Sequence, residues 1–184
     1  MNYKRILFFL GIYSLFVSFF AFLNILYCLY FSFILDLNSY LVCFFISAII
    51  GIIFYTLGRK DEKNIFIEEQ IIIIAVGCIY LPFLISLPYY FSSYNMSLLN
   101  SFFESASGFT STGFSIIENV QDINEPLLLW RSTSQWIGGM FFLIAIVGTF
   151  GSKRIKLKPT NLVSNISFTG NMIKDSRFND NFFI

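Results

Sequence analysis

The chain has 184 residues, of which 56% are hydrophobic and 12% charged, with a formal net charge of +1. A soluble domain carries roughly twice that share of charged residues. The sequence contains no histidine, which excludes Ser-His-Asp and Cys-His catalysis and the usual zinc sites. Its balanced charge points to no nucleic acid partner. We therefore expect an integral membrane protein that is not an enzyme and has no cofactor.

Four long apolar stretches cover residues 6–33, 40–57, 71–91 and 127–150. Each approaches or exceeds the ~20 residues that an α-helix needs to cross a bilayer. The first follows Lys4 and Arg5 as a secretory signal would, but it is too long and lacks a small-residue cleavage site, so we interpret it as a permanent anchor. Pro82 and Pro88 lie late in the third stretch and predict a kink without a break.

The basic residues outside these stretches predict the orientation of the chain. The residues are Lys4, Arg5, Arg59, Lys60, Lys63, Lys153, Arg154, Lys156 and Lys158. The other two connections, 35–39 and 92–126, contain neither Lys nor Arg. Four spans place all the basic clusters on one side, which the positive-inside rule makes the cytoplasm. Cys28, Cys43 and Cys78 stand singly in apolar stretches and are expected to be buried free thiols.

The long outer connection contains a short helical pattern over residues 97–109, with Ser97 or Asn95 as its expected cap. A helix of this length reaches only about 20 Å, so it cannot cross the membrane. It has the length of a pore helix that enters the bilayer and returns. Irregular backbone at membrane depth is tolerated only where protein or water surrounds it.

The residues that follow this helix are Thr110, Ser111, Thr112, Gly113 and Phe114. Such a sequence suits an extended loop whose carbonyl groups replace the water around an ion. Glycine can adopt a positive φ at little cost, and the negative end of the helix dipole points toward the loop. The alternative is an ordinary turn between a surface helix and an extended segment. Spacing alone leaves both interpretations open.

Two longer motifs favour the first interpretation. Residues 102–113 read FFESASGFTSTG, and residues 130–139 read WRSTSQWIGG. They resemble the first pore loop, and the start of the next helix, in the Trk/Ktr/HKT superfamily of potassium transporters. The resemblance is detailed over residues 71–150. The two earlier stretches match the extra N-terminal helix pair of the bacterial members in number and place only.

The resemblance implies an all-α integral membrane fold with four transmembrane helices, one re-entrant pore helix and a filter loop. Residues 1–63 would form the N-terminal transmembrane helix pair, residues 64–151 one helix–pore loop–helix repeat, and residues 152–184 a polar cytoplasmic tail. In the family, four such repeats in one chain surround a central pore. The protein would lie in the bacterial inner membrane, with both ends in the cytoplasm.

The resemblance also assigns the site. Thr110, Ser111, Thr112, Gly113 and Phe114 would form one strand of the selectivity filter, whose backbone carbonyls bind potassium as the transported substrate. Gly113 would be the position least open to substitution.

Four further residues are expected to support the filter: Glu104, Arg131, Gly138 and Gly139. Glu104 would attract cations or bind the filter backbone. Arg131 would pair with Glu125, Asp122 or Glu118, or hold the filter from behind. The glycine pair would allow close helix packing.

Three residues near the fourth stretch are expected to be structural. Pro126 suits the first turn of a helix, because its missing N–H has no partner there anyway. Trp130 and Trp136 are expected to lie at the outer membrane interface, where indole rings commonly settle.

Only one pore loop is present in the 184 residues. One strand cannot encircle an ion, so we expect a truncated, TrkH-like subunit of a potassium uptake system. Other chains, or further copies in a homo-oligomer, would supply the remaining repeats. A cytoplasmic nucleotide-binding regulatory subunit and membrane lipid are the other expected partners. The competing hypotheses are a non-transporting membrane adaptor and a degraded gene product.

Overall fold

The computed structural model describes residues 3–58, 67–117 and 123–151, and these residues form five helices and no strand. The helices are α1 (Tyr3–Tyr30), α2 (Ile34–Gly58), α3 (Ile67–Tyr90), α4 (Leu98–Phe109) and α5 (Glu125–Gly151). The predicted all-α class is confirmed. The chain divides into two units, Met1–Thr149 and Phe150–Ile184. The first unit contains α1 to α4 and nearly all of α5, and the expected tail 152–184 lies outside the described residues.

Three of the helices are long and apolar enough to cross a membrane: Tyr3–Tyr30, Ile34–Gly58 and Glu68–Tyr90. The chain is therefore a membrane protein with three candidate spans. The fourth predicted span coincides with α5, which has 27 residues but is not among the candidates. Its N-terminal half contains the polar run 131–135, which lowers its hydropathy. The length of α5 is enough to cross a membrane, and the fourth span stays a prediction.

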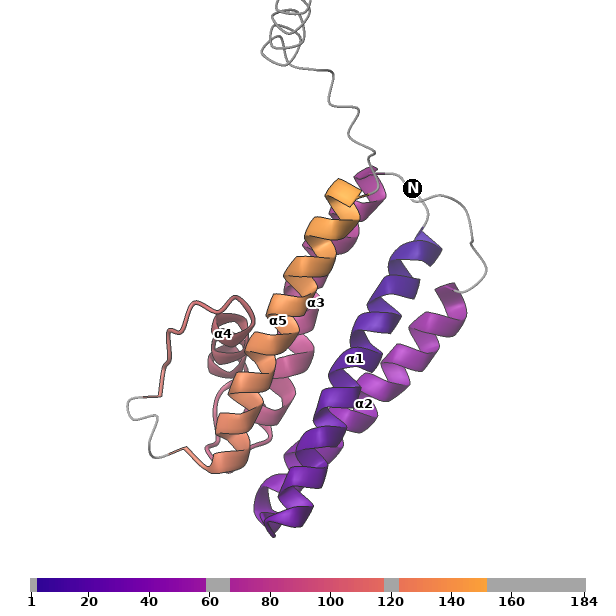
Figure 1. Ribbon diagram of the computed structural model, residues 1–184. Coiled ribbons are helices and arrows are strands. Elements are labelled where there is room, and N and C mark those ends of the chain that lie inside the picture. The colour runs from indigo at the N-terminus through magenta and orange to yellow at the C-terminus, as the bar shows by residue number, and fades with distance from the viewer. Residues whose placement is uncertain (1–2, 59–66, 118–122, 152–184) are drawn as a thin grey trace, which may run out of the picture. The chain divides into compact units, whose positions relative to one another are not determined.

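The helices α1 and α2 pack against each other along their length, and α3 contacts both of them. Figure 1 shows α1 beside α2 and α5 beside α3. At one end, Arg5 of α1 forms a buried ion pair with Glu69 of α3, with 2.6 Å between Nη1 and Oε2. Further along, the Ser14 and Tyr80 hydroxyls are 2.5 Å apart. Polar contacts therefore hold α3 against the helix pair.

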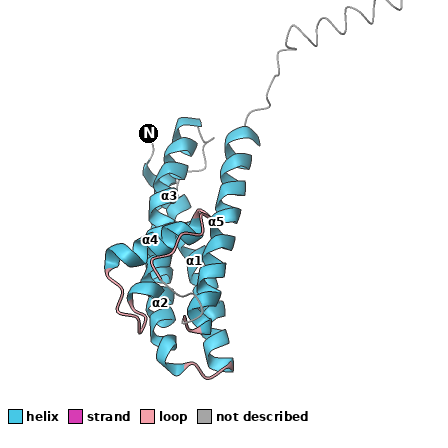
Figure 2. Ribbon diagram, turned by 90° about the vertical axis from the view of Figure 1, so that its left-hand side faces the viewer, coloured by secondary structure: helices cyan, strands magenta, loops and turns pink. Residues whose placement is uncertain are grey.

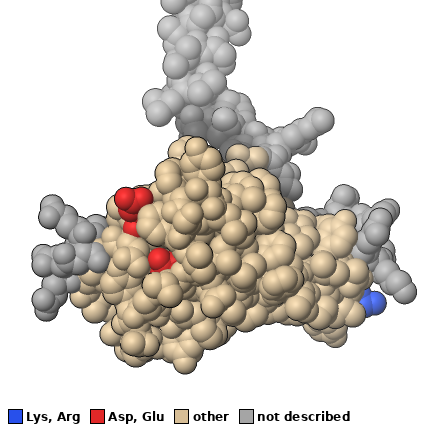
Figure 3. All heavy atoms as spheres, turned by 90° about the horizontal axis from the view of Figure 1, so that it is seen from below, with Lys and Arg blue, Asp and Glu red and all other residues tan. Residues whose placement is uncertain are grey.

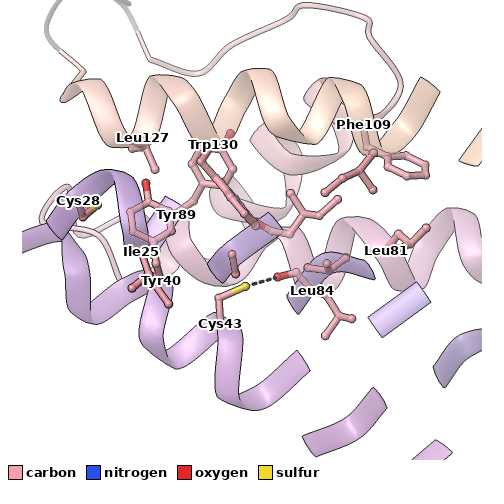
Figure 4. Close-up of a cluster of buried hydrophobic side chains, with 14 of the residues drawn as sticks. Ile25, Cys28, Tyr40, Cys43, Leu81, Leu84, Tyr89, Phe109, Leu127 and Trp130 are labelled. Atoms are coloured by element: carbon pink, nitrogen blue, oxygen red, sulfur yellow. Dashed lines mark hydrogen bonds between the residues drawn. The ribbon is translucent and has the colours of Figure 1, made fainter. Parts of the chain in front are cut away.

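Both prolines of α3 lie inside a continuous helix, as predicted. A proline lacks the N–H that would bind the carbonyl four residues earlier, so Pro88 leaves the Leu84 carbonyl without its helical donor. The Cys43 thiol of α2 donates to this carbonyl at 3.7 Å, as Figure 4 shows. A neighbouring helix thus satisfies the backbone group that proline releases. Cys28 and Cys43 are buried, but Cys78 is exposed, so the prediction for Cys78 was wrong.

Trp130 of α5 occupies the centre of the core (Figure 4). Its side chain is 0% exposed, its indole N–H donates to the Ile85 carbonyl at 3.0 Å, and its ring lies 5.8 Å from that of Tyr40. The expectation that Trp130 lies at the membrane interface was therefore wrong, because its face of α5 packs onto α2 and α3. Trp136, by contrast, is 70% exposed.

The two tryptophans form a matched pair for a stability test. We expect Trp130→Phe to lower the free energy of unfolding by about 1–2 kcal/mol, since it removes a buried hydrogen bond and leaves a small cavity. Trp136→Phe should change it by less than about 0.5 kcal/mol. Denaturant titration of the purified chain in mixed micelles, followed by circular dichroism, measures both. Equal effects would contradict the assignment of Trp130 to the core.

Candidate functional site

The short helix α4 is held at its start by a cap and along its length by α3. The Ser97 hydroxyl accepts the Asn100 N–H at 3.3 Å, so Ser97 is the N-cap. Ser105 donates to the Pro82 carbonyl of α3 at 2.7 Å. Figure 2 shows α4 lying across the long helices. Its 12 residues span only about 18 Å, as predicted for a helix too short to cross a bilayer.

The helix ends in a closed turn instead of leading directly into extended backbone. The Thr112 N–H donates to the Ser107 carbonyl at 3.0 Å, and the Ser111 N–H donates to the Gly108 carbonyl at 2.9 Å. Ser111 has a φ of 54°, in the left-handed region. This is the Schellman arrangement that satisfies the last carbonyls of a helix. The expected extended loop therefore begins only at Thr112.

Beyond the turn, Gly113 has a φ of +83°, which favours glycine. All five residues from Thr110 to Phe114 are exposed. Within the described residues, the carbonyls of Thr110, Ser111 and Thr112 accept no hydrogen bond. The other two carbonyls have partners: Arg131 Nη2 donates to Gly113 at 3.4 Å, and Ser107 donates to Phe114 at 2.5 Å. The five expected filter residues thus differ in how available their carbonyls are.

Glu104 lies on α4 behind the loop and is 1% exposed. Its Oε1 accepts the Ile116 N–H at 2.6 Å and the Ser115 hydroxyl at 2.7 Å. A buried carboxylate with two donors holds its partners firmly. Of the two roles expected for Glu104, the structure shows hydrogen bonds to the backbone immediately after the loop.

Arg131 of α5 contacts both Glu104 and the loop. Its Nη1 lies 3.5 Å from Glu104 Oε2 and donates to the Ser115 hydroxyl at 3.1 Å. Glu125, one of the three acidic partners expected for Arg131, instead accepts a hydrogen bond from the Tyr27 hydroxyl at 3.3 Å. The other two, at positions 118 and 122, lie outside the described residues. Arg131 therefore stands behind the loop.

The two glycines of α5 differ in their surroundings. A Cβ at Gly138 would overlap the carbonyl oxygen of Phe109, the last residue of α4. A Cβ at Gly139 would meet no atom within 4 Å. Of the pair expected to allow close packing, Gly138 alone does so in the described structure.

Sequence reasoning missed three serines: Ser105, which holds α4 against α3, and Ser107 and Ser115, which hold the loop. The first two donate to backbone carbonyls, and Ser115 bridges Glu104 and Arg131. For Ser105 and Ser107 the signal is the number of hydroxyls in the short α4, because a hydroxyl inside a membrane needs an acceptor. Ser115 lies after the loop and outside that helix.

A cavity of about 820 Å³ adjoins the start of the loop. Thr110 and Ser111 line it together with Phe109, and the other lining residues belong to α3 and α5 and are mostly apolar, including Ile74, Phe142 and Ile146. Seen from the end where α1 joins α2, the surface consists mostly of uncharged residues (Figure 3). The loop thus lies beside space bounded almost entirely by apolar groups.

Comparison with known proteins identifies the family. Residues 38–167 match the TrkH family, described as cation transport proteins. The chain is 30% identical over 105 residues to the Trk system potassium uptake protein TrkH of Escherichia coli. This match covers 56% of this chain and 22% of that protein. It is also 30% identical over 108 residues to an uncharacterized cation transporter of Methanocaldococcus jannaschii, over 58% of this chain and 23% of that protein.

A third relative, the potassium uptake protein TrkI of Halomonas elongata, is 39% identical over 59 residues, covering 32% of this chain and 12% of its own. No solved structure matches the chain significantly. The matches thus cover less than a quarter of these relatives' own length. The family comprises transport proteins, so the chain is not an enzyme, as predicted. The family match covers more than half of the sequence, and the chain therefore belongs to the TrkH family of cation transport proteins.

Proposed function

We propose that this chain contributes one strand of a potassium-selective filter to a TrkH-like uptake system, and that residues 110–114 form the strand. The observation that carries the proposal is the row of three carbonyls, at Thr110, Ser111 and Thr112, that accept no hydrogen bond within the described residues. Backbone carbonyls are the groups that replace the hydration shell of potassium in selective pores.

The electrostatics around the loop support cation binding. The C-terminal end of α4 carries the negative end of the helix dipole, and the three carbonyls lie there. The positive charge of Arg131 would repel a cation, but Glu104 lies 3.5 Å from it and offsets that charge. Arg131 and Glu104 hold the loop from behind, and the carbonyls bind the ion.

The proposal extends to the organisation of the chain. Residues 1–63 form the transmembrane helix pair, residues 64–151 form the helix–pore loop–helix repeat with α5 as its last span, and residues 152–184 form a cytoplasmic tail. The basic clusters place both ends in the cytoplasm of the plasma membrane.

A filter needs several strands around the ion. The others come from further repeats, either in other chains or in additional copies of this one. A cytoplasmic nucleotide-binding subunit is the regulatory partner that the family resemblance suggests.

A chimera tests the proposal. Residues 3–151 of this chain replace the corresponding region of Escherichia coli TrkH, and the product is expressed in cells that lack their own potassium uptake. We expect rubidium uptake, and we expect Gly113→Asp to reduce it to background, because the substitution places a carboxylate and a strained backbone within the filter. Ser132→Ala is the control, since Ser132 is exposed and donates within its own helix.

The same cells expressing this chain alone complete the experiment. Uptake that Gly113→Asp abolishes would show that copies of the chain assemble a pore. No uptake from well-inserted protein would show that other strands are needed. Uptake by the chimera that survives Gly113→Asp would refute the filter assignment.

A further inference from the structure

The carboxylate of Asp36 connects the α1–α2 helix pair to Asn124, the residue that precedes α5. Asp36 lies in the first turn of α2 and is 5% exposed. A carboxylate is favoured at a helix N-terminus, because the positive end of the dipole lies there. Burial nevertheless makes it costly unless other groups donate to it. The donors to Asp36 come from the other half of the chain.

Asn124, which ends the outer connection, is the principal donor. Its Nδ2 donates to Asp36 Oδ2 at 3.2 Å, and Ser93 donates to Oδ1 at 3.5 Å. The Asn124 backbone N–H donates to the Tyr94 hydroxyl at 2.7 Å. Its carbonyl accepts the N–H groups of Leu127 and Leu128 at 3.0 and 3.1 Å. Asn124 therefore starts α5, and Asp36 holds its side chain.

Two further contacts join the same parts of the chain. The Tyr27 hydroxyl of α1 donates to Glu125 Oε2 at 3.3 Å. The Tyr40 ring of α2 lies 5.8 Å from the Trp130 ring of α5. The helix pair thus contacts the start of α5 through three residues: Asp36, Tyr27 and Tyr40.

We propose that Asp36 is a positioning residue, through which the helix pair sets where α5 begins. The consequence for the loop follows from Arg131, which lies on α5 and donates to the Gly113 carbonyl at 3.4 Å. A shift or rotation of the start of α5 would move this guanidinium relative to the loop. The consequence for ion passage rests on the proposed function, whereas the positioning of α5 does not.

A reciprocal exchange of side chains tests the positioning. Asn124→Asp places two carboxylates together yet keeps a good N-cap for α5. The double variant, Asn124→Asp with Asp36→Asn, again has one amide and one carboxylate, with their positions exchanged. Asn38→Asp is the control. It also changes an asparagine to an aspartate, but at an exposed position near the start of α2, close to Asp36. Hydrogen–deuterium exchange of the purified full chain in nanodiscs measures the opening of α5.

We expect Asn124→Asp to speed exchange in the first turns of α5 by about tenfold or more, and the exchanged pair to restore it to within about twofold. Asn38→Asp should leave exchange there unchanged. If Asn124→Asp fails to fold while the pair folds, the proposal is also supported. Either of two results would overturn the proposal. One is exchange at the wild-type rate in Asn124→Asp, and the other is exchange in the double variant as fast as in Asn124→Asp.

The chimera then provides the functional measurement. We expect Asn124→Asp to reduce the preference for rubidium over sodium in uptake by about tenfold, with the exchanged pair restoring it. A general loss of stability would lower both uptakes together without changing their ratio. The double variant could restore wild-type exchange in α5 while the chimera transports nothing. That result would uphold the positioning by Asp36 and refute the proposed function.

Discussion

Replacing Glu104 by alanine is expected to lower the free energy of unfolding by about 3–5 kcal/mol. The carboxylate is 1% exposed and accepts hydrogen bonds from Ile116 and Ser115. It is also the counter-ion of Arg131, whose side chain is only 12% exposed. Removing it leaves the Ile116 N–H and the Ser115 hydroxyl without their acceptor, and the guanidinium without its counter-ion, in a site that water reaches poorly. Denaturant titration of the purified chain in mixed micelles measures the loss.

Two further variants separate the contributions at this site. Glu104→Gln keeps an acceptor oxygen and removes the charge, so we expect about half the loss. Glu104→Ala combined with Arg131→Met should be more stable than Glu104→Ala alone, because the uncompensated charge is gone. Glu68→Ala is the control, since Glu68 is exposed. A loss below about 1 kcal/mol in Glu104→Ala would show that this network does not stabilise the loop.

The elements of this fold were predictable because the membrane imposes strong constraints on a sequence. Apolar stretches of spanning length correspond to α1, α2 and α3. The largest error is at the start of α2, which begins at Ile34 and so includes residues 35–39, predicted to be a connection. The short α4 and its Ser97 cap follow from apolar spacing and a hydroxyl at the start. These signals are local, so they could be read without knowing which helices are neighbours.

The partners of individual side chains were not predictable in this way. Arg131 was expected to pair with one of three acidic residues close to it in sequence or to hold the filter from behind, and no local pattern indicated the ion pair it forms with Glu104, 27 positions earlier. Trp130 resembled an interfacial residue until α5 was placed against α3. Both outcomes depend on how α4 and α5 pack, which no local pattern specifies.

The loop after α4 shows a different limit. Its composition predicted an extended segment from Thr110, yet the last carbonyls of the helix needed donors, and the N–H groups of Ser111 and Thr112 supply them. The turn therefore takes up two residues that composition assigned to the loop. Ser111 adopts a positive φ although it is not glycine, which composition gave no reason to expect.

The adjacent glycines of α5 give the second large effect. We expect Gly138→Ala to lower the free energy of unfolding by about 3 kcal/mol, because its Cβ would overlap the Phe109 carbonyl oxygen and backbone atoms must move. Gly139→Ala should instead raise it by up to about 1 kcal/mol, since alanine is the better helix former and the space is open. The same denaturant titration compares the two, and similar effects would contradict the close approach of α4 to α5.

The two glycine variants also test what surrounds the loop in a complete pore. Phe109 directly precedes Thr110, so a displaced Phe109 should disturb the loop, and Gly138→Ala should abolish uptake by the chimera. Gly139 is open in the described structure and lines the cavity beside the loop. If Gly139→Ala leaves the isolated chain stable but impairs the chimera, another segment must pack over that glycine. If it impairs neither, the cavity stays open in the assembled transporter.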